Sequence, residues 1–175
     1  MDSPPASSGA GADALARAGA PPAIAAPAST EPPADGYVRL QVLAEASAGP
    51  GRLAHFDPEV VEHVDVLDTW IRQSLRANPA RLRVLTARGH SMSGVVEDGD
   101  LLFVEPCAAF ETDGLYVLSV GDLLRVKRLR LRIADRQLSI ESTDGSAPEL
   151  VPLAAIGDSV RVQGRVVGAW TLRRF

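Results

Sequence analysis

The sequence predicts a mainly β domain with one short helix, preceded by a disordered N-terminal tail. From Tyr37 onward, short stretches alternate apolar and polar residues and end at turn residues such as Asp144 and Gly145. Within residues 68–77 the apolar side chains instead follow helical spacing. The chain has 175 residues, of which 46% are apolar, so it is long enough for one ordinary domain with a core.

The first 36 residues differ in composition from the rest of the chain. Ala, Pro, Gly and Ser dominate them, no aromatic residue occurs, and Leu15 and Ile24 are their large aliphatic residues. Such a segment cannot offset its ordering entropy by burying apolar surface. We expect residues 1–36 to be a disordered tail and residues 37–175 to be the folded domain.

The predicted elements follow from alternation and from turn residues. Residues 46–51 are small, with two glycines and a proline, and predict an exposed loop. Residues 60–67 fit either a helix begun near Asp57 or an alternating strand, and this choice stays open. The helix over 68–77 should end at Asn78-Pro79. Strands are predicted over residues 37–43, 81–88, 101–105, 115–120, 123–133, 137–142 and 159–172.

Composition argues against several kinds of function. The net charge is −4 and the pI about 5.4, so no overall nucleic-acid surface is expected, although arginines gather between Arg125 and Arg132. The single cysteine, Cys107, rules out an internal disulfide. The three histidines show no metal-ligand spacing, so we expect no metal and no cofactor. No apolar run could span a bilayer, so a cytoplasmic protein without a membrane partner is expected.

Two residues carry the chemical hypothesis, Ser91 in the loop Gly89-His90-Ser91-Met92 and Lys127, 36 positions later. A serine in a tight loop can be a nucleophile if a nearby amine takes its proton. Alternation places Lys127 on the strand face of Leu129, Leu131 and Ile133, where partial burial disfavours the charged ammonium.

The alternative is that Lys127 has only a structural role. It would begin a basic face of the strand and extend its amine to water, and Arg125 on the same face of the strand supports this reading. Gly-x-Ser is also common in loops. The turn at Glu97-Asp98-Gly99-Asp100 is read simply as a turn. From these residues alone, a structural role for Ser91 and Lys127 is favoured over a catalytic one.

The order of the motifs along the chain favours a catalytic role for Ser91 and Lys127 instead. Five motifs follow one another along the chain. They are a loop of small residues at 47–51, Gly-x-Ser-Met from Gly89, the turn Asp98-Gly99-Asp100, the strand that carries Lys127, and Gly-x-x-x-Gly from Gly164. This order resembles the serine-lysine autopeptidase domain of LexA, UmuD and phage-type repressors, which shares its fold with signal peptidases. The resemblance covers residues 37–175.

The resemblance implies specific roles. Ser91 would be the nucleophile, Lys127 the neutral amine that accepts its proton, and the backbone N–H groups of His90 and Ser91 the oxyanion donors. The cut bond would be Ala48-Gly49. The implied partners are a second copy of the chain, as a homodimer, and a RecA filament.

Several features depart from the family. His90 stands where the family usually has aspartate or one of a small set of alternatives, and Gly94 replaces a frequent proline. Residues 1–36 are too short and too poor in apolar periodicity for a helix-turn-helix, so we expect no operator binding by this chain alone.

Two alternative functions stay open. One is a catalytically silent dimerisation or interaction module of a repressor that has lost its helix-turn-helix. The other is a signal-peptidase relative, which the missing membrane anchor disfavours.

Overall fold

The fold is described by a computed structural model that covers residues 31–43, 60–121, 123–157 and 160–171. The predicted tail up to residue 30, the predicted loop at 46–51 and the proposed Ala48-Gly49 bond lie outside these residues. Nine strands form one sheet in the order β2-β1-β3-β4-β9-β5-β6-β7-β8. β1 and β3 pair in parallel, and the other neighbours pair antiparallel.

A short helical insertion follows the first two strands of the chain. β1 (Tyr37–Leu43) and β2 (Val60–Leu67) precede α1 (Asp68–Trp70), a π-helical turn (Ile71–Leu75) and a 3₁₀ turn (Pro79–Arg81). The rest is β3 (Arg83–Thr86), β4 (Leu101–Pro106), β5 (Gly114–Val120), β6 (Leu123–Arg132), β7 (Gln137–Glu141), β8 (Glu149–Pro152), a 3₁₀ turn (Leu153–Ala155) and β9 (Val160–Trp170). No helix in this described part is long and apolar enough to cross a membrane.

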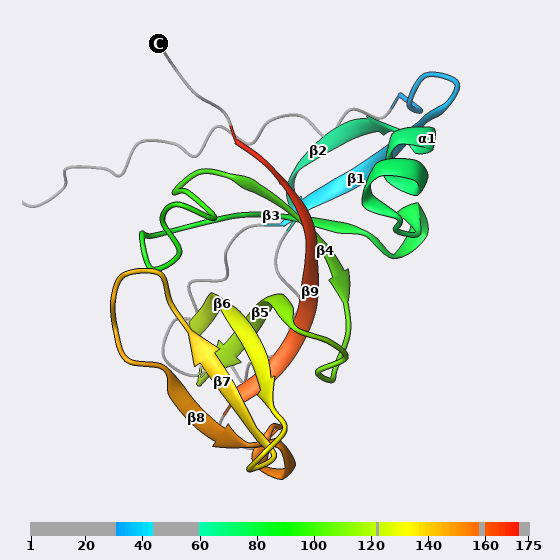
Figure 1. Cartoon of the computed structure of the whole chain (residues 1–175). Coiled ribbons are helices and arrows are strands. Elements are labelled where there is room, and N and C mark those ends of the chain that lie inside the picture. The colour runs from blue at the N-terminus through cyan, green and yellow to red at the C-terminus, as the bar shows by residue number, and fades with distance from the viewer. Residues whose placement is uncertain (1–30, 44–59, 122, 158–159, 172–175) are drawn as a thin grey trace, which may run out of the picture.

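The longest strand, β9, joins two halves of the sheet. It pairs with β4 on one side and β5 on the other, and Figure 1 shows it running along both halves. We call β2-β1-β3-β4 the N-terminal half-sheet and β5-β6-β7-β8 the C-terminal half-sheet. Residues far apart in sequence therefore come together across β9.

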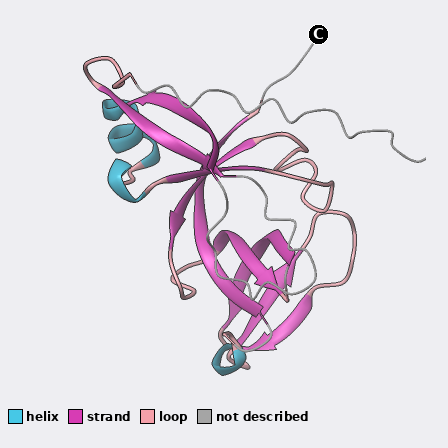
Figure 2. Cartoon of the chain, turned by 180° about the vertical axis from the view of Figure 1, so that it is seen from behind, coloured by secondary structure: helices cyan, strands magenta, loops and turns pink. Residues whose placement is uncertain are grey.

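Three apolar clusters hold this arrangement together. The first lies where the helical turns pack on the N-terminal half-sheet, around Ile71 and Phe103 (Figure 2). Trp70 and Trp170 add edge and tilted ring contacts to it. The second cluster draws on both half-sheets, with Leu85, Leu102 and Val117 among its members. The third surrounds Tyr116 and Leu129 in the C-terminal half-sheet.

Comparison with the sequence confirms a mainly β fold with one short helical region. The open segment at 60–67 is the strand β2, held along β1 by antiparallel pairing with a register shift between Val42 and Leu43. The helix ends at Arg76, whose left-handed conformation (φ 52°) stops it before Asn78. β8 was not predicted. Its four residues sit mostly exposed at the sheet edge, where no burial imposes alternation.

The strand predicted over 81–88 is shorter at both ends, since β3 runs from Arg83 to Thr86. The apolar face predicted for β6 is only partly correct. Leu129 is fully buried and Lys127 half-buried, but Leu131 and Ile133 are 37% and 83% exposed. Ile133 follows the end of the strand at Arg132, so no sheet neighbour covers it.

The close approach of β9 to β4 gives a stability prediction. A Cβ on Gly164 would lie 2.5 Å from Val104 Cγ1 and 3.0 Å from the backbone oxygen of Glu105. Backbone cannot move aside easily, so Gly164→Ala should lower the free energy of unfolding by about 1–3 kcal/mol. Urea unfolding of the full chain measures this change.

Two glycines serve as matched controls. In Gly168→Ala the new methyl meets chiefly the flexible end of Leu75, so the loss should be smaller. In Gly114→Ala it would lie 3.9 Å from Tyr116, an ordinary contact, and stability should change little. Equal midpoints for all three variants would contradict the close-packing account.

Candidate active site

Ser91 lies in a compact loop that connects β3 to β4. Hydrogen bonds from the Ser93 N–H to the His90 carbonyl (3.1 Å) and from the Val96 N–H to the Met92 carbonyl (2.8 Å) fold the loop on itself. Met92 and Val96 are buried in the cluster shared by the two half-sheets. The loop is thus anchored by its apolar residues, and Ser91 stays partly exposed.

The acidic turn that follows holds both ends of this loop. The Asp98 carboxylate accepts a hydrogen bond from the Gly89 N–H (2.8 Å), and the Glu97 carboxylate accepts one from the Gly94 N–H (2.7 Å). The backbone of Ala87 pairs with Gly99 and Asp100 beside them. Sequence reasoning assigned this segment no role beyond a turn, yet its carboxylates position the loop that carries Ser91.

The glycine at position 94 has a local explanation. Gly94 has φ of 87°, a left-handed conformation that proline cannot adopt, and its N–H makes the bond to Glu97. Glycine therefore fits this position better than the usual proline. The hydrogen bond to the Glu97 carboxylate restrains the loop, as a proline ring would otherwise do.

The backbone at the serine leaves two donors available. Within the described residues, neither the His90 nor the Ser91 N–H donates a hydrogen bond. Gly89, with φ of 86°, turns the chain sharply just before them. Free N–H groups beside a nucleophile are what an oxyanion site requires.

Lys127 lies in the middle of β6, on the C-terminal half-sheet, with Tyr116 of β5 as its neighbour in register. Its side chain is half-buried, and the amine donates a hydrogen bond to the Ser142 hydroxyl just after β7. In the described part of the chain, no hydrogen bond joins Lys127 to Ser91.

Two consecutive residues nevertheless connect the predicted pair. Ser142 accepts from the Lys127 amine, while the Thr143 N–H donates to the Ser91 carbonyl (2.9 Å). The Thr143 hydroxyl also donates to the Ser93 carbonyl (2.8 Å). The serine loop and the lysine are therefore fastened to the same short segment, although they come from different half-sheets.

Asp144 gives this segment a negative charge near the amine. Hydrogen bonds from the hydroxyl (2.6 Å) and N–H (3.0 Å) of Ser146 lower the pKa of Asp144, and the positive charge of Lys127 adds a smaller effect in the same direction. Asp144 is therefore ionised at neutral pH.

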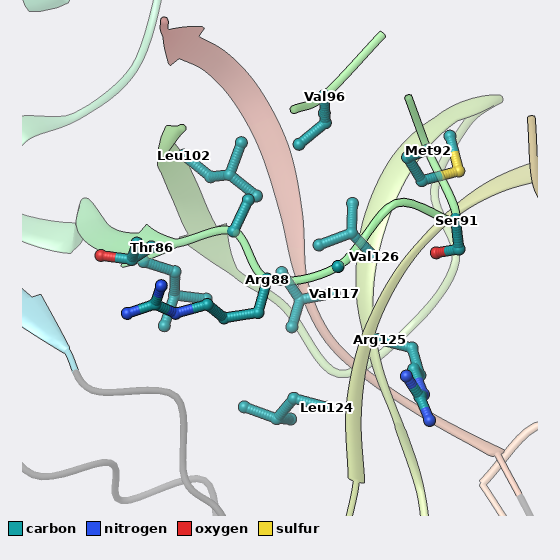
Figure 3. Close-up of a pocket in the computed structure, with 13 residues that line it drawn as sticks. Thr86, Arg88, Ser91, Met92, Val96, Leu102, Val117, Leu124, Arg125 and Val126 are labelled. Atoms are coloured by element: carbon teal, nitrogen blue, oxygen red, sulfur yellow. The ribbon is translucent and has the colours of Figure 1, made fainter. Parts of the chain in front are cut away.

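A small pocket of about 40 Å³ opens beside Ser91 (Figure 3). Its walls are mostly apolar and come from both half-sheets, including Leu102, Val117 and Val126. The guanidinium-bearing side chains of Arg88 and Arg125 also line it. Such a pocket can hold a small apolar side chain next to the serine hydroxyl. Among the described residues, no group of three His, Cys, Asp or Glu side chains could hold a metal ion.

Comparisons with known proteins identify the class. The model of the Peptidase S24-like family matches residues 41–167, a range that includes Ser91 and Lys127. The chain therefore belongs to the Peptidase S24-like family. A 26 kDa repressor protein of Escherichia phage HK022 is 34% identical over 102 residues, which cover 55% of this chain and 43% of that protein. The chain thus spans less than half the length of this relative.

The carboxylate contact to the serine loop gives a second prediction. Asp98→Ala removes the acceptor for the Gly89 N–H, so amide hydrogen exchange at Gly89 should accelerate about fivefold, as expected for loss of a hydrogen bond worth about 1 kcal/mol. Exchange measured by NMR on the full chain tests this. Asp98→Asn keeps an oxygen acceptor and is the matched control. Unchanged exchange at Gly89 in the alanine variant would refute the positioning role.

Proposed function

We propose that this chain is a self-cleaving serine peptidase of a LexA-like or phage-repressor-like regulator, which cuts its own Ala48-Gly49 bond. Membership of the Peptidase S24-like family supports the class. The observation that carries the proposal is the shared attachment of the Ser91 loop and the Lys127 amine to Ser142 and Thr143. The proposed reaction requires the lysine side chain to turn from Ser142 toward the serine hydroxyl.

The proposed reaction runs in two stages. The Ser91 oxygen attacks the carbonyl carbon of Ala48 while the neutral Lys127 amine takes the hydroxyl proton. The negative oxygen is stabilised by the N–H groups of His90 and Ser91. The bond to Gly49 breaks as Lys127 returns the proton to the leaving amine. Water, deprotonated by Lys127, then releases Ala48 from the ester on Ser91.

Strand pairing supports an internal substrate. β1 and β3 run in parallel, with Val42 beside Val84 and Leu43 beside Leu85. The proposed Ala48-Gly49 bond follows five residues after Leu43. The five residues after Leu43 can extend at most about 18 Å, so this bond can reach only the surroundings of the strand end. Glycine after the cut lets the backbone bend closely past the serine.

One observation favours a second candidate, a catalytically silent interaction module. The Lys127 amine donates to Ser142, and no bond to Ser91 is present in the described part of the chain. In such a module the segment at Ser142 and Thr143 would only hold the two half-sheets together. The homodimer implied by the resemblance would fit either candidate, whereas the RecA filament would be a partner of the self-cleaving one, and both partners are part of this proposal.

The central test uses substitutions of the proposed pair. Incubation of the purified chain at raised pH should yield fragments 1–48 and 49–175, identified by intact mass. Ser91→Ala and Lys127→Ala should each slow this cleavage at least about a thousandfold. Ser93→Ala is the matched control, because Ser93 is exposed in the same loop and its hydroxyl makes no hydrogen bond among the described residues. A chain that stays intact at every pH supports the silent module.

The charge near Lys127 gives a prediction on pH. Because only the uncharged amine can accept a proton, cleavage should accelerate from neutral to alkaline pH. Asp144→Asn removes the negative charge that interacts with the charge of Lys127, so the rate profile should move to lower pH.

The matched control for this shift is Asp135→Asn. Asp135 pairs with Arg132 in the turn between β6 and β7. The control profile should coincide with that of the unsubstituted chain. A profile that moves to higher pH in Asp144→Asn would contradict the electrostatic role of this residue.

A further inference from the structure

Thr143 joins the loop of Ser91 to the C-terminal half-sheet. It lies between β7 and β8, and its N–H donates to the Ser91 carbonyl (2.9 Å). Its hydroxyl donates to the Ser93 carbonyl (2.8 Å) and makes a longer contact of 3.4 Å with the Ser91 carbonyl. Among the described residues, every hydrogen bond between residues 89–96 and the C-terminal half-sheet comes from Thr143.

These contacts complete a support that the acidic turn begins. The Asp98 carboxylate holds the Gly89 N–H from the N-terminal half-sheet. Thr143 holds the Ser91 carbonyl from the other half-sheet. The peptide groups that carry the N–H groups of His90 and Ser91 lie between these two contacts in the chain. The orientation of both proposed oxyanion donors, and of the serine between them and the carbonyl, is therefore set from both half-sheets.

The residue before Thr143 connects this support to the lysine. Ser142 accepts a hydrogen bond from the Lys127 amine. Consecutive Cα atoms lie about 3.8 Å apart, so Ser142 and Thr143 cannot separate. The Lys127 side chain and the Ser91 loop are thus held at adjacent points of one backbone, and Thr143 is the point that reaches the serine.

We infer that Thr143 is a positioning residue for the Ser91 nucleophile and its oxyanion donors. It acts through the Ser91 and Ser93 carbonyls and not on a reacting atom. The inference rests on the proposed self-cleavage and adds a residue to its machinery. In the silent interaction module, the same contacts would contribute to stability alone.

Paired substitutions at position 143 test this role in the full chain. Thr143→Val keeps the side-chain shape and the backbone N–H but removes the hydroxyl that donates to Ser93. It should slow self-cleavage about fivefold, as expected for the loss of one hydrogen bond. Thr143→Ser keeps the hydroxyl and should restore most of the rate.

Thr112→Val is the matched control for the loss of a threonine hydroxyl. Thr112 lies before β5, and its backbone bonds to the Tyr116 hydroxyl survive the substitution. Its own hydroxyl makes no hydrogen bond in the described part of the chain. This variant should cleave at the unsubstituted rate. A small loss of stability alone leaves nearly all molecules folded, so it does not slow cleavage under native conditions.

A second measurement does not depend on cleavage. It adds Thr143→Val to the Ser91→Ala chain and follows NMR signals. The carbonyl carbon of Ser93 should shift because it loses its donor. The N–H signals of residues 90 and 91 should shift with it, because the loop is then held less firmly from the C-terminal half-sheet. Thr143→Ser should return these signals toward their original positions, and Thr112→Val should leave them unchanged.

The outcomes separate the two proposals. If the unsubstituted chain never cleaves, self-cleavage fails, and the N–H signals of residues 90 and 91 alone decide whether Thr143 positions the loop. If the chain cleaves but Thr143→Val is as fast as Thr112→Val, or these signals do not respond, the positioning role is refuted while self-cleavage stands. Slow cleavage that Thr143→Ser does not restore also refutes it, because the hydroxyl would then not be the cause.

Discussion

The candidate site depends on the close pairing of β9 with β4 and β5. The loop of Ser91 belongs to the N-terminal half-sheet, whereas Lys127, Ser142 and Thr143 belong to the C-terminal one. Only β9 pairs with both halves among the described strands. Gly164 allows this strand to approach Val104 to a distance that no side chain would permit. Apolar side chains from both halves then fill the cluster that lies beneath the serine loop.

Much of the fold could be predicted from the sequence because burial imposes a period on it. β1, β4 and β5 each bury several side chains, and their apolar residues mark them clearly. The segment at Val60–Leu67 stayed ambiguous because its apolar residues fit both the helical and the strand repeat. In the structure it pairs with β1 and is therefore a strand. At the outer edge, β8 has little burial, so its sequence carried almost no signal.

The positions of Ser91 and Lys127 could be singled out, but the means of holding them could not. The contact from Asp98 to Gly89 joins a carboxylate to a backbone N–H, and any acidic residue at a suitable distance could make it. The bond from Lys127 to Ser142 depends on the register of β6 and β7, which alternation alone does not fix. In the sequence, Arg125 supported a solvated basic face. In the structure, its side chain lines the pocket beside Ser91.

The place of β9 in the chain order has a consequence for timing. It is the last strand of the described fold, about 30 residues after Lys127 in the sequence. A polypeptide still on the ribosome contains both side chains of the proposed catalytic pair well before it contains the strand that joins their half-sheets. Domains fold as units once their residues have emerged. The proposed self-cleavage would therefore begin only after β9 has been synthesised and paired. Nascent chains that lack β9 would not cleave themselves.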